Sequence, residues 1–381
     1  CWISTPKPWI IGVVGSAKEF PVMSPKERLL LIGNFASAWT DTSAKVCEVL
    51  AAGFEQAGHV VLTASQRRFR PGRLADMAWT TWHQRQRFDL AIIETFSTAA
   101  LCWSEICAIL ARRAGKPVVL VLHGGALPQR YQQSPARLAR HFARAQALVS
   151  PSGYLADEFS QRGYKVHVID NPVAVQGLHP RTRTAVSAKL IWARAFDREV
   201  YNPEMAVRVV ARLREKYPDL RLVMAGPDRG GLAAVKALAR SLGVLQNITF
   251  AGRLPKADLL DAYNEADILL HTNRIDNMPV SVIEAQAAGL CVVGTAVRGL
   301  PWEVRHQADG LLIPSDDDQA MAAAIIDLLE SPALAQRLSS QARVRSQAYQ
   351  WPSVYARWQN LFRSLASHPA SVVGAGLNTD G

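Results

Sequence analysis

Two carboxylates bracket a short apolar stretch in the second half of the 381-residue chain, Asp276 just before a proline and Glu284 just after it. Pro279 has no N–H and therefore suits the first position of a helix, which the pattern predicts over residues 280–288. Asp276 then lies in the preceding loop, and Glu284 lies in the second helical turn. The unpaired N–H groups of such a helix start attract anions, so a diphosphate fits there, between carboxylates that hold hydroxyl groups. On spacing alone, a capped loop followed by a surface glutamate explains the same residues at least equally well.

Motifs for other common ligands do not occur in the sequence. No Gly-x-Gly-x-x-Gly follows an expected strand, which argues against a nicotinamide dehydrogenase, and no Gly-x-x-x-x-Gly-Lys-Ser/Thr marks a P-loop. The acidic run at 316–318 comes directly before a helical stretch, where carboxylates stabilise the helix dipole. Capping is therefore favoured over metal binding. We expect neither a metal nor a resident cofactor.

Apolar runs of strand length alternate with amphipathic stretches of helix length, which is typical of a parallel sheet with helices on both faces. The expected strands are 29–32, 59–62, 90–93, 118–122, 147–150 and 166–169, then 189–192, 220–224, 248–250, 268–270 and 291–293. Turn-forming residues near 170–180 separate the two series. The sequence thus predicts an α/β protein of two doubly wound, Rossmann-like units that face each other across a cleft at the carboxyl ends of both sheets.

Breaks in this pattern set the expected domain boundaries. They are an N-terminal appendage at 1–22, a first unit at 23–175, a second unit at 176–350, a C-terminal helix at 351–365 that returns to the first unit, and a disordered tail at 366–381. No apolar run approaches the roughly 20 residues that span a bilayer. The five cysteines form no Cys-x-x-Cys pair and lie mostly in apolar patterns, so they are expected to be reduced core residues, as in a cytoplasmic protein.

Several motifs that occur in order resemble the retaining glycosyltransferases of family 4, also called glycosyl transferases group 1, which have the GT-B fold. That family shows a glutamate, seven residues, a second glutamate, an alanine-rich helix and Gly-x-Pro-Val-Val; here residues 276–293 read DNMPVSVIEAQAAGLCVV. Residues 295–303 and 308–314 continue the likeness, which extends over about 29–362. The resemblance implies that the first unit binds an acceptor and the second unit a nucleotide-diphosphate sugar donor.

The resemblance also assigns roles to individual residues. The catalytic residues would be Asp276, His123 and Arg194, of which the first two orient the sugar and the third binds the diphosphate. The donor-binding residues would be Glu284, Asn277, Met278, Pro279, Val280, Gly226, Arg253 and Leu254. The loops near the acceptor and the phosphate would contain Gly33, Asn34 and Gly124. A histidine at a strand end is by itself more often structural, so the role of His123 depends on the resemblance.

Departures from the family pattern concern the charges around the donor. Asp276 is one methylene shorter than the usual first glutamate, and Cys291 stands where proline is common. The family usually presents an arginine and, a few residues later, a lysine to the diphosphate. Arg194 matches the arginine and suits bidentate phosphate contacts, but no lysine lies near Asn202. Lower donor affinity, a shifted cation such as Arg198, and lost activity all remain open.

A basic and aromatic segment in the first unit indicates a surface for an anionic partner. The net charge is +11, and most of it lies in the first half of the chain. Arg67, Arg68 and Arg70 come shortly before Trp79 and Trp82, which are three apart and share one face of an expected helix. This composition suits the headgroup region of an anionic membrane, and a solvated face with buried tryptophans explains it about as well. No nucleic-acid-binding module accompanies it, so no nucleic acid partner is expected.

Taken with the resemblance, these residues predict a hexosyltransferase-type enzyme. It would move a sugar from a nucleotide-diphosphate donor to a hydroxyl of a glycan, lipid-linked or other acceptor, with retained configuration and without metal. Cell-envelope or exopolysaccharide synthesis would be its setting, in the cytoplasm or peripherally on the inner face of the membrane. Two alternatives share the fold: a sugar-nucleotide epimerase or hydrolase, and a non-catalytic protein that binds sugar nucleotides.

Overall fold

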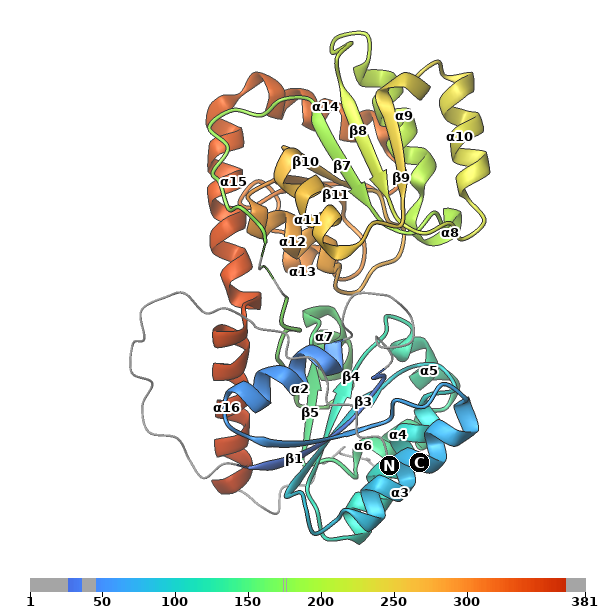
Figure 1. The fold of residues 1–381 in the computed structure, drawn as a ribbon, viewed down its shortest axis with the longest axis vertical. Helices are drawn as coiled ribbons and strands as arrows, with labels where there is room; N and C mark the ends of the chain where they lie inside the picture. Colours follow the sequence, from blue (N-terminus) through green and yellow to red (C-terminus); the bar gives the residue numbers. More distant parts are fainter. Residues whose placement is uncertain (1–26, 36–45, 174, 176, 368–381) are drawn as a thin grey trace, which may run out of the picture.

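The computed structural model describes residues 27–35, 46–173, 175 and 177–367. In this part of the chain two α/β units, each built on a six-stranded parallel sheet, lie end to end (Figure 1). The helices α15 (Pro332–Ser346) and α16 (Trp351–Ser367) follow one another along one side of the molecule (Figure 1). The expected appendage at 1–22 and the tail from residue 368 lie outside the described residues.

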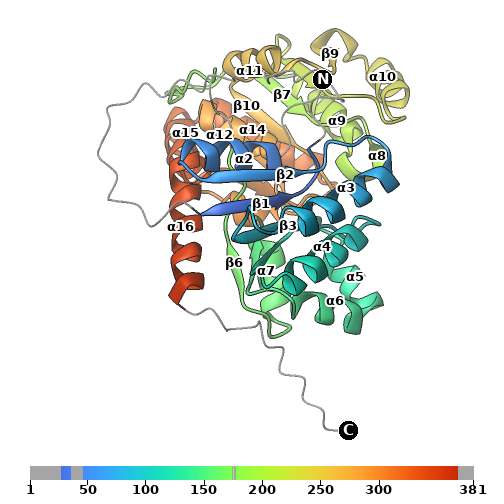
Figure 2. The same ribbon diagram turned by 60° about the horizontal axis from the view of Figure 1, so that its bottom comes forward.

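The first sheet has the strand order β2-β1-β3-β4-β5-β6, with all neighbours parallel. Its strands are β1 (Arg28–Ile32), β2 (Val60–Ala64), β3 (Leu90–Thr95), β4 (Val118–Leu122), β5 (Ala147–Ser150) and β6 (Val166–Val168). One face is covered by α2 (Val46–Gln56) and α16, and the other by α3 (Arg70–His83), α4 (Leu101–Arg113), α5 (Leu127–Gln133), α6 (Pro135–Phe142) and α7 (Gly153–Ser160) (Figure 2). Alternate strand residues enter these two layers, so both faces require apolar side chains.

The second sheet has the order β12-β11-β10-β7-β8-β9, again with parallel neighbours. Its strands are β7 (Lys189–Ala193), β8 (Arg221–Ala225), β9 (Ile248–Gly252), β10 (Ile268–His271), β11 (Cys291–Thr295) and β12 (Leu311–Ile313). One face packs against α9 (Pro203–Leu213), α10 (Leu232–Ser241), α14 (Asp318–Glu330) and α15, and the other against α11 (Lys256–Glu265), α12 (Val280–Ala288) and α13 (Leu300–Glu303). The short helices α8 (Arg198–Tyr201), η1 (Leu245–Asn247) and η2 (Gln347–Tyr349) lie in connections.

Each sheet reverses its winding direction at one place. The chain runs from β1 to β2 on one side and then returns to β3 on the other side of β1. In the same way it runs from β7 through β8 to β9 and then returns to β10 beside β7. A crevice opens at the carboxyl ends of the strands where such a reversal occurs. The loops after β1, β3, β4, β7, β8 and β10 therefore surround the expected ligand cleft.

Helix α16 connects the C-terminal part of the described chain to the first sheet. Its residues Val354, Trp358, Leu361 and Phe362 pack into the layer that contains α2. The ring of Trp358 lies 5.6 Å from that of Phe54 and is fully buried. Residues 366 and 367 were expected in a disordered tail, but they are helical because the apolar side of α16 continues to Leu365, which packs against the same layer.

Two findings bear on membrane insertion and on thiol chemistry. Among the described residues, no helix combines the length and the apolar character needed to cross a bilayer. Cys47, Cys102, Cys107 and Cys291 are free thiols, and all except Cys102 are buried. Cys102 lies at the surface of α4, so it is not the core residue that the apolar pattern suggested.

Candidate active site

Asp276 lies in the loop after β10, where four groups hold its carboxylate. Arg194 Nη2 and Asn273 Nδ2 each donate to Oδ2 at 2.6 Å. His271 Nε2 lies 3.4 Å from the same oxygen, and the backbone N–H of Asn277 donates to Oδ1 at 2.8 Å. The carboxylate is therefore fixed in position by its surroundings before any ligand binds.

The protonation state of Asp276 follows from this setting. Burial acts to raise the pKa of Asp276, but the Arg194 guanidinium and the contacts with His271 and Asn277 outweigh burial and hold that pKa well below its usual range. The side chain is thus an anion at any physiological pH. It can accept hydrogen bonds from sugar hydroxyls, but it has no proton to donate as a general acid.

Arg194 directly follows β7, and its place depends on a glycine in the neighbouring strand connection. Gly226 follows β8 with φ of 158°, and a Cβ there would stand 1.7 Å from the carbonyl oxygen of Arg194. Only glycine permits this approach. Arg194 also lies 5.6 Å from the ring centre of Tyr201, and its buried Nε has no hydrogen-bond partner. The Nε–H of the guanidinium thus remains for a ligand.

Helix α12 spans the residues that the sequence predicted, but Pro279 is not its first helical residue. Pro279 is the N-cap, with ψ of 102°, and Val280 is the first helical residue; it is 37% exposed. Pro279 therefore sits just outside the helix, because its extended ψ does not continue into helical geometry. Met278 packs against Val173 and other apolar residues at the junction of the two units.

Glu284 is buried, which contradicts the alternative of a surface glutamate. The residue is 5% exposed, and its Oε1 pairs with Lys256 Nζ. Lys256 opens α11, shortly after Arg253 and Leu254 in the loop that follows β9. Arg253 is exposed and Leu254 is partly buried. The sequence analysis missed Lys256, although its place after the carboxyl end of β9 was a signal for a cation near the donor.

The position near Asn202, where the family's lysine was expected, has a structural role instead. Asn202 adopts a left-handed conformation, and its Nδ2 donates to Asp316 at 2.8 Å. Arg198, considered as a shifted cation, pairs with Glu204 at the surface. The structure thus places Lys256, and not Arg198, beside a residue expected to bind the donor.

The first unit contributes a second group of polar residues around His123. His123 follows β4, is 8% exposed and stacks on Phe96 at 5.2 Å. Glu94 lies in β3, and its Oε1 is 3.6 Å from His123 Nε2. The other carboxylate oxygen accepts the backbone N–H of Asn34 at 3.3 Å, and a Cβ on Gly33 would stand 2.7 Å from it. Glu94 therefore joins the two loops that the sequence analysis selected separately.

Burial sets the charges of this pair. It raises the pKa of Glu94 to about 7 and lowers the pKa of His123 to about 4. His123 is therefore neutral near pH 7, and Glu94 changes its charge there. The sequence analysis missed Glu94, for which the only signal was a carboxylate at the end of an otherwise apolar strand.

The loops of the two units contact each other across the cleft. Arg298 Nη1 donates to the carbonyl oxygen of Gly125 at 3.0 Å, and Ser152 Oγ donates to that of Asn277 at 3.4 Å. A Cβ on Gly125 would lie 3.8 Å from Cβ of Asn277. The His-Gly-Gly turn with Gly124, whose φ is 90°, thus faces the Asp276 loop directly. A small ligand part placed between them would meet both.

The acidic run at 316–318 lies outside this arrangement. Asp317 caps α14 by accepting the N–H of Ala320 at 2.8 Å, so the capping prediction is confirmed for this residue. Asp318 pairs with Arg208 and Arg212. The described part of the chain contains no cluster of three histidine, cysteine or carboxylate residues suited to a metal.

Two family models match this chain, one in each unit. The model described as Glycosyltransferase Family 4 matches residues 44–176, and that described as Glycosyl transferases group 1 matches residues 188–345. The D-inositol 3-phosphate glycosyltransferase of Corynebacterium urealyticum is 30% identical over 48% of this chain and 45% of its own length. That of Streptomyces scabiei is 26% identical over 72% of this chain and 67% of its own length. The first of these matches spans less than half of the relative's length.

Solved structures resemble the whole described fold. Sucrose-phosphate synthase from Thermosynechococcus elongatus superposes with a TM-score of 0.70 at 19% identity, over 90% of this chain and 100% of that one. Anabaena HepE, solved in complex with UDP-glucose, gives a TM-score of 0.65 at 19% identity, with the same coverage. These likenesses establish the GT-B fold, and with the two family models they show that the chain belongs to the family 4 glycosyltransferases that carry a group 1 second domain.

Proposed function

We propose that this protein transfers a sugar from a nucleotide-diphosphate donor to an acceptor hydroxyl with retention of configuration. The observation that carries the proposal is the Asp276 carboxylate, ionised and held by Arg194, opposite the His123 turn of the other unit. Such an anion orients hydroxyls of the transferred sugar. Nucleotide binding by the second unit and acceptor binding by the first unit would bring the reactants together in the cleft.

The leaving group is stabilised by residues of the second unit. Arg194 and the N–H groups of the first turn of α12 would receive the charge that develops on the diphosphate, so we expect no metal requirement. Glu284, buried beside Lys256, would accept hydrogen bonds from the ribose. Asp276 and His123 position the sugar. The acceptor hydroxyl attacks from the face on which the diphosphate leaves, and the leaving phosphate takes its proton. This front-face attack needs no nucleophile from the protein. The contacts of Arg298 and Ser152 close the cleft against water.

The donor site is tested by thermal unfolding with a panel of nucleotide-diphosphate sugars. Because HepE was solved with UDP-glucose, uridine donors are the first choice. A true donor at 100 times its Kd stabilises the native state by about 2.7 kcal/mol, and this gain should vanish in Glu284→Gln. Glu330→Gln is the matched control, because Glu330 also pairs with a lysine but at the exposed surface. If the donor still stabilises Glu284→Gln against thermal unfolding, Glu284 does not belong to the donor site.

The same preparation separates the alternatives. Release of nucleoside diphosphate only with acceptor supports transfer. Donor turnover without acceptor would identify an epimerase or hydrolase, and tight binding without turnover would identify a non-catalytic protein.

We also propose that the first unit contacts the anionic inner face of the cell membrane. Acceptors of envelope or exopolysaccharide synthesis would then reach the cleft. Phe69 is 72% exposed, Trp79 52% and Trp82 38%, which is contrary to the interpretation of buried tryptophans. The guanidinium of Arg85 lies 4.7 Å from the ring centre of Trp82. Arg67 and Arg68, just before the start of α3, are exposed and line a hollow of about 630 Å³ with Asp76, while Trp79 and Trp82 lie near the end of that helix. Cations beside exposed aromatic rings suit a headgroup layer.

Vesicle sedimentation tests this surface. The protein should sediment with vesicles that contain anionic lipid and much less with neutral vesicles, because basic residues contribute about 1 kcal/mol each at such a surface. Replacing Arg67, Arg68 and Trp79 together should reduce binding at least tenfold. Replacing Arg140 on α6 and Arg144 just after this helix with alanine is the control for a general loss of charge. Equal binding to both kinds of vesicle would remove the proposal.

A further inference from the structure

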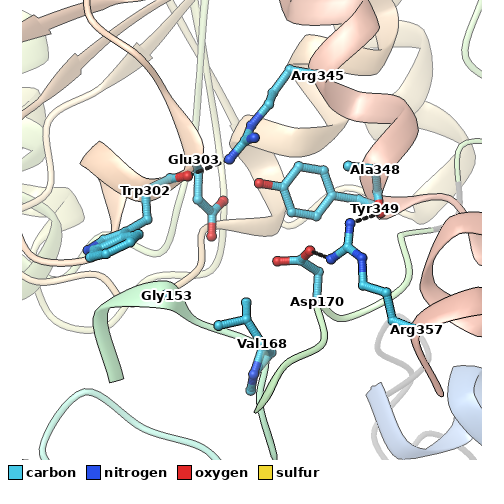
Figure 3. A pocket seen from close by; sticks show the side chains of 10 residues that line it. Gly153, Val168, Asp170, Trp302, Glu303, Arg345, Ala348, Tyr349 and Arg357 are labelled. Carbon is cyan, nitrogen blue, oxygen red and sulfur yellow. Dashed lines mark hydrogen bonds and ion pairs between the residues drawn. The ribbon is translucent and has the colours of Figure 1, made fainter. Parts of the chain in front are cut away.

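A cavity of about 250 Å³ lies at the junction of the two units, beside the transfer cleft (Figure 3). Residues of both units line it, among them Asp170, Arg357, Trp302, Glu303, Arg345 and Tyr349. Asp170 follows the last strand of the first sheet, and Arg357 belongs to α16, which packs on that sheet. Glu303 ends α13 in the second unit, and Arg345 lies near the end of α15.

Polar atoms without partners face this cavity. Glu303 is 4% exposed, and its Oε2 has no hydrogen-bond partner. Arg345 donates through Nη2 to the carbonyl oxygen of Trp302 at 2.6 Å, but its buried Nε has no partner either. Figure 3 shows the Glu303 carboxyl, the Tyr349 hydroxyl and the Asp170 carboxylate pointing toward one another. Buried polar atoms normally have partners, so the unpaired Glu303 and Arg345 atoms can accept a bound group in this cavity.

The lining combines hydrogen-bond donors, acceptors and an aromatic ring. Arg345 offers a free N–H, and Asp170, which pairs with Arg357, offers carboxylate oxygens. Burial, and then the nearby Asp170 and Asp276, raise the pKa of Glu303 well above its ordinary value, which favours the protonated form that can donate. The indole of Trp302 is 48% exposed and lies against Gly153, where a Cβ would stand 2.5 Å from it.

We propose that this cavity binds one polyhydroxylated ring, either a sugar or a cyclic polyol, outside the transfer site. Each hydroxyl of such a ring both donates and accepts, which matches the alternating donors and acceptors, and its apolar face can pack on the Trp302 indole. Drug-sized ligands occupy pockets of about 300–1,000 Å³, so the smaller volume here fits a single ring. A charged ligand is less suited, because each arginine already has an acceptor.

Helix α13 links this cavity to the transfer site. At its start, the N–H of Gly299 donates to the carbonyl oxygen of Asp276 at 3.2 Å, and a Cβ on Gly299 would stand 1.7 Å from the carbonyl oxygen of Asn277. At its end, Glu303 faces the cavity. A ring bound there touches both units and therefore favours the arrangement in which the His123 turn faces Asp276.

The test is calorimetric titration of the full chain, without nucleotide, with free glucose, galactose and myo-inositol at millimolar concentrations. At least one ring should bind, and Trp302→Ala and Tyr349→Phe should each weaken binding at least tenfold. Leu242→Ala, which removes an exposed apolar side chain at the end of α10, outside the residues that line the cavity, should leave it unchanged. Thermal unfolding of each variant checks that it is folded.

The variant Asp276→Asn distinguishes ring binding in this cavity from ring binding in the donor cleft. Binding in the cavity should be retained in this variant. The proposal is overturned if no ring binds, or if binding is lost in Asp276→Asn and kept in Trp302→Ala. Because donor binding is measured separately with nucleotide sugars, failure of the ring site is distinguishable from failure of the proposed transfer activity.

Discussion

Replacing Asp276 with alanine is expected to lower kcat/KM for sugar transfer by about a thousandfold. The change removes the anion that orients the sugar and leaves the part-buried Arg194 without its ion-pair partner. Loss of a single preorganised group at a reacting centre costs about 10²–10³ in rate, and a misplaced Arg194 adds to this loss. The measurement is release of nucleoside diphosphate in the presence of acceptor.

Two further variants make this result specific. Asp276→Asn keeps the shape but not the charge, so its activity should lie between those of the wild type and the alanine variant. Asp89→Ala breaks an arginine–aspartate pair that is about half exposed in the first unit, and it should transfer sugar normally. Wild-type rates in Asp276→Ala would exclude this carboxylate from the reaction.

Replacing Glu94 with glutamine is expected to stabilise the protein more at high pH than at low pH. The difference in free energy of unfolding between the variant and the wild type should be more favourable to the variant above pH 7 than at pH 4.5, by on the order of 3 kcal/mol. Burial raises the pKa of Glu94 from 4.5 to about 7, so the folded state holds a proton that the unfolded chain releases between these values. The wild type therefore loses stability as pH rises through this window, and the glutamine variant does not. His123 is present in both proteins, and its contribution cancels in the comparison.

Urea unfolding of both proteins from pH 4.5 to 8 measures this difference. It should grow up to about pH 7 and then remain constant. Glu105→Gln is the control, because the hydrogen bond from Arg137 lowers the pKa of Glu105, so its difference from the wild type should stay nearly constant from pH 4.5 to 8 and change only below this range. A constant difference between wild type and Glu94→Gln would show that Glu94 does not retain its proton in the folded protein.

The fold could be predicted from the sequence because each of its elements has a local sequence pattern. Each buried parallel strand needs a short apolar run, and each covering helix needs an amphipathic stretch, so the alternation appears directly in the sequence. Asp276, Glu284, Arg194 and His123 lie at or near the ends of such elements, and the family resemblance then assigned their roles.

The sequence by itself therefore determined two doubly wound units and the loops that carry the reacting groups. Only the tertiary structure decided which groups share a site. Lys256 reaches Glu284 from another helix, Glu94 joins His123 to the Asn34 loop, and Arg298 reaches the opposite unit. These contacts join residues from 28 to 173 positions apart, and no local pattern encodes such a distance. The junction cavity has the same origin, because burial between two units raises the pKa of Glu303 and leaves its Oε2 without a partner.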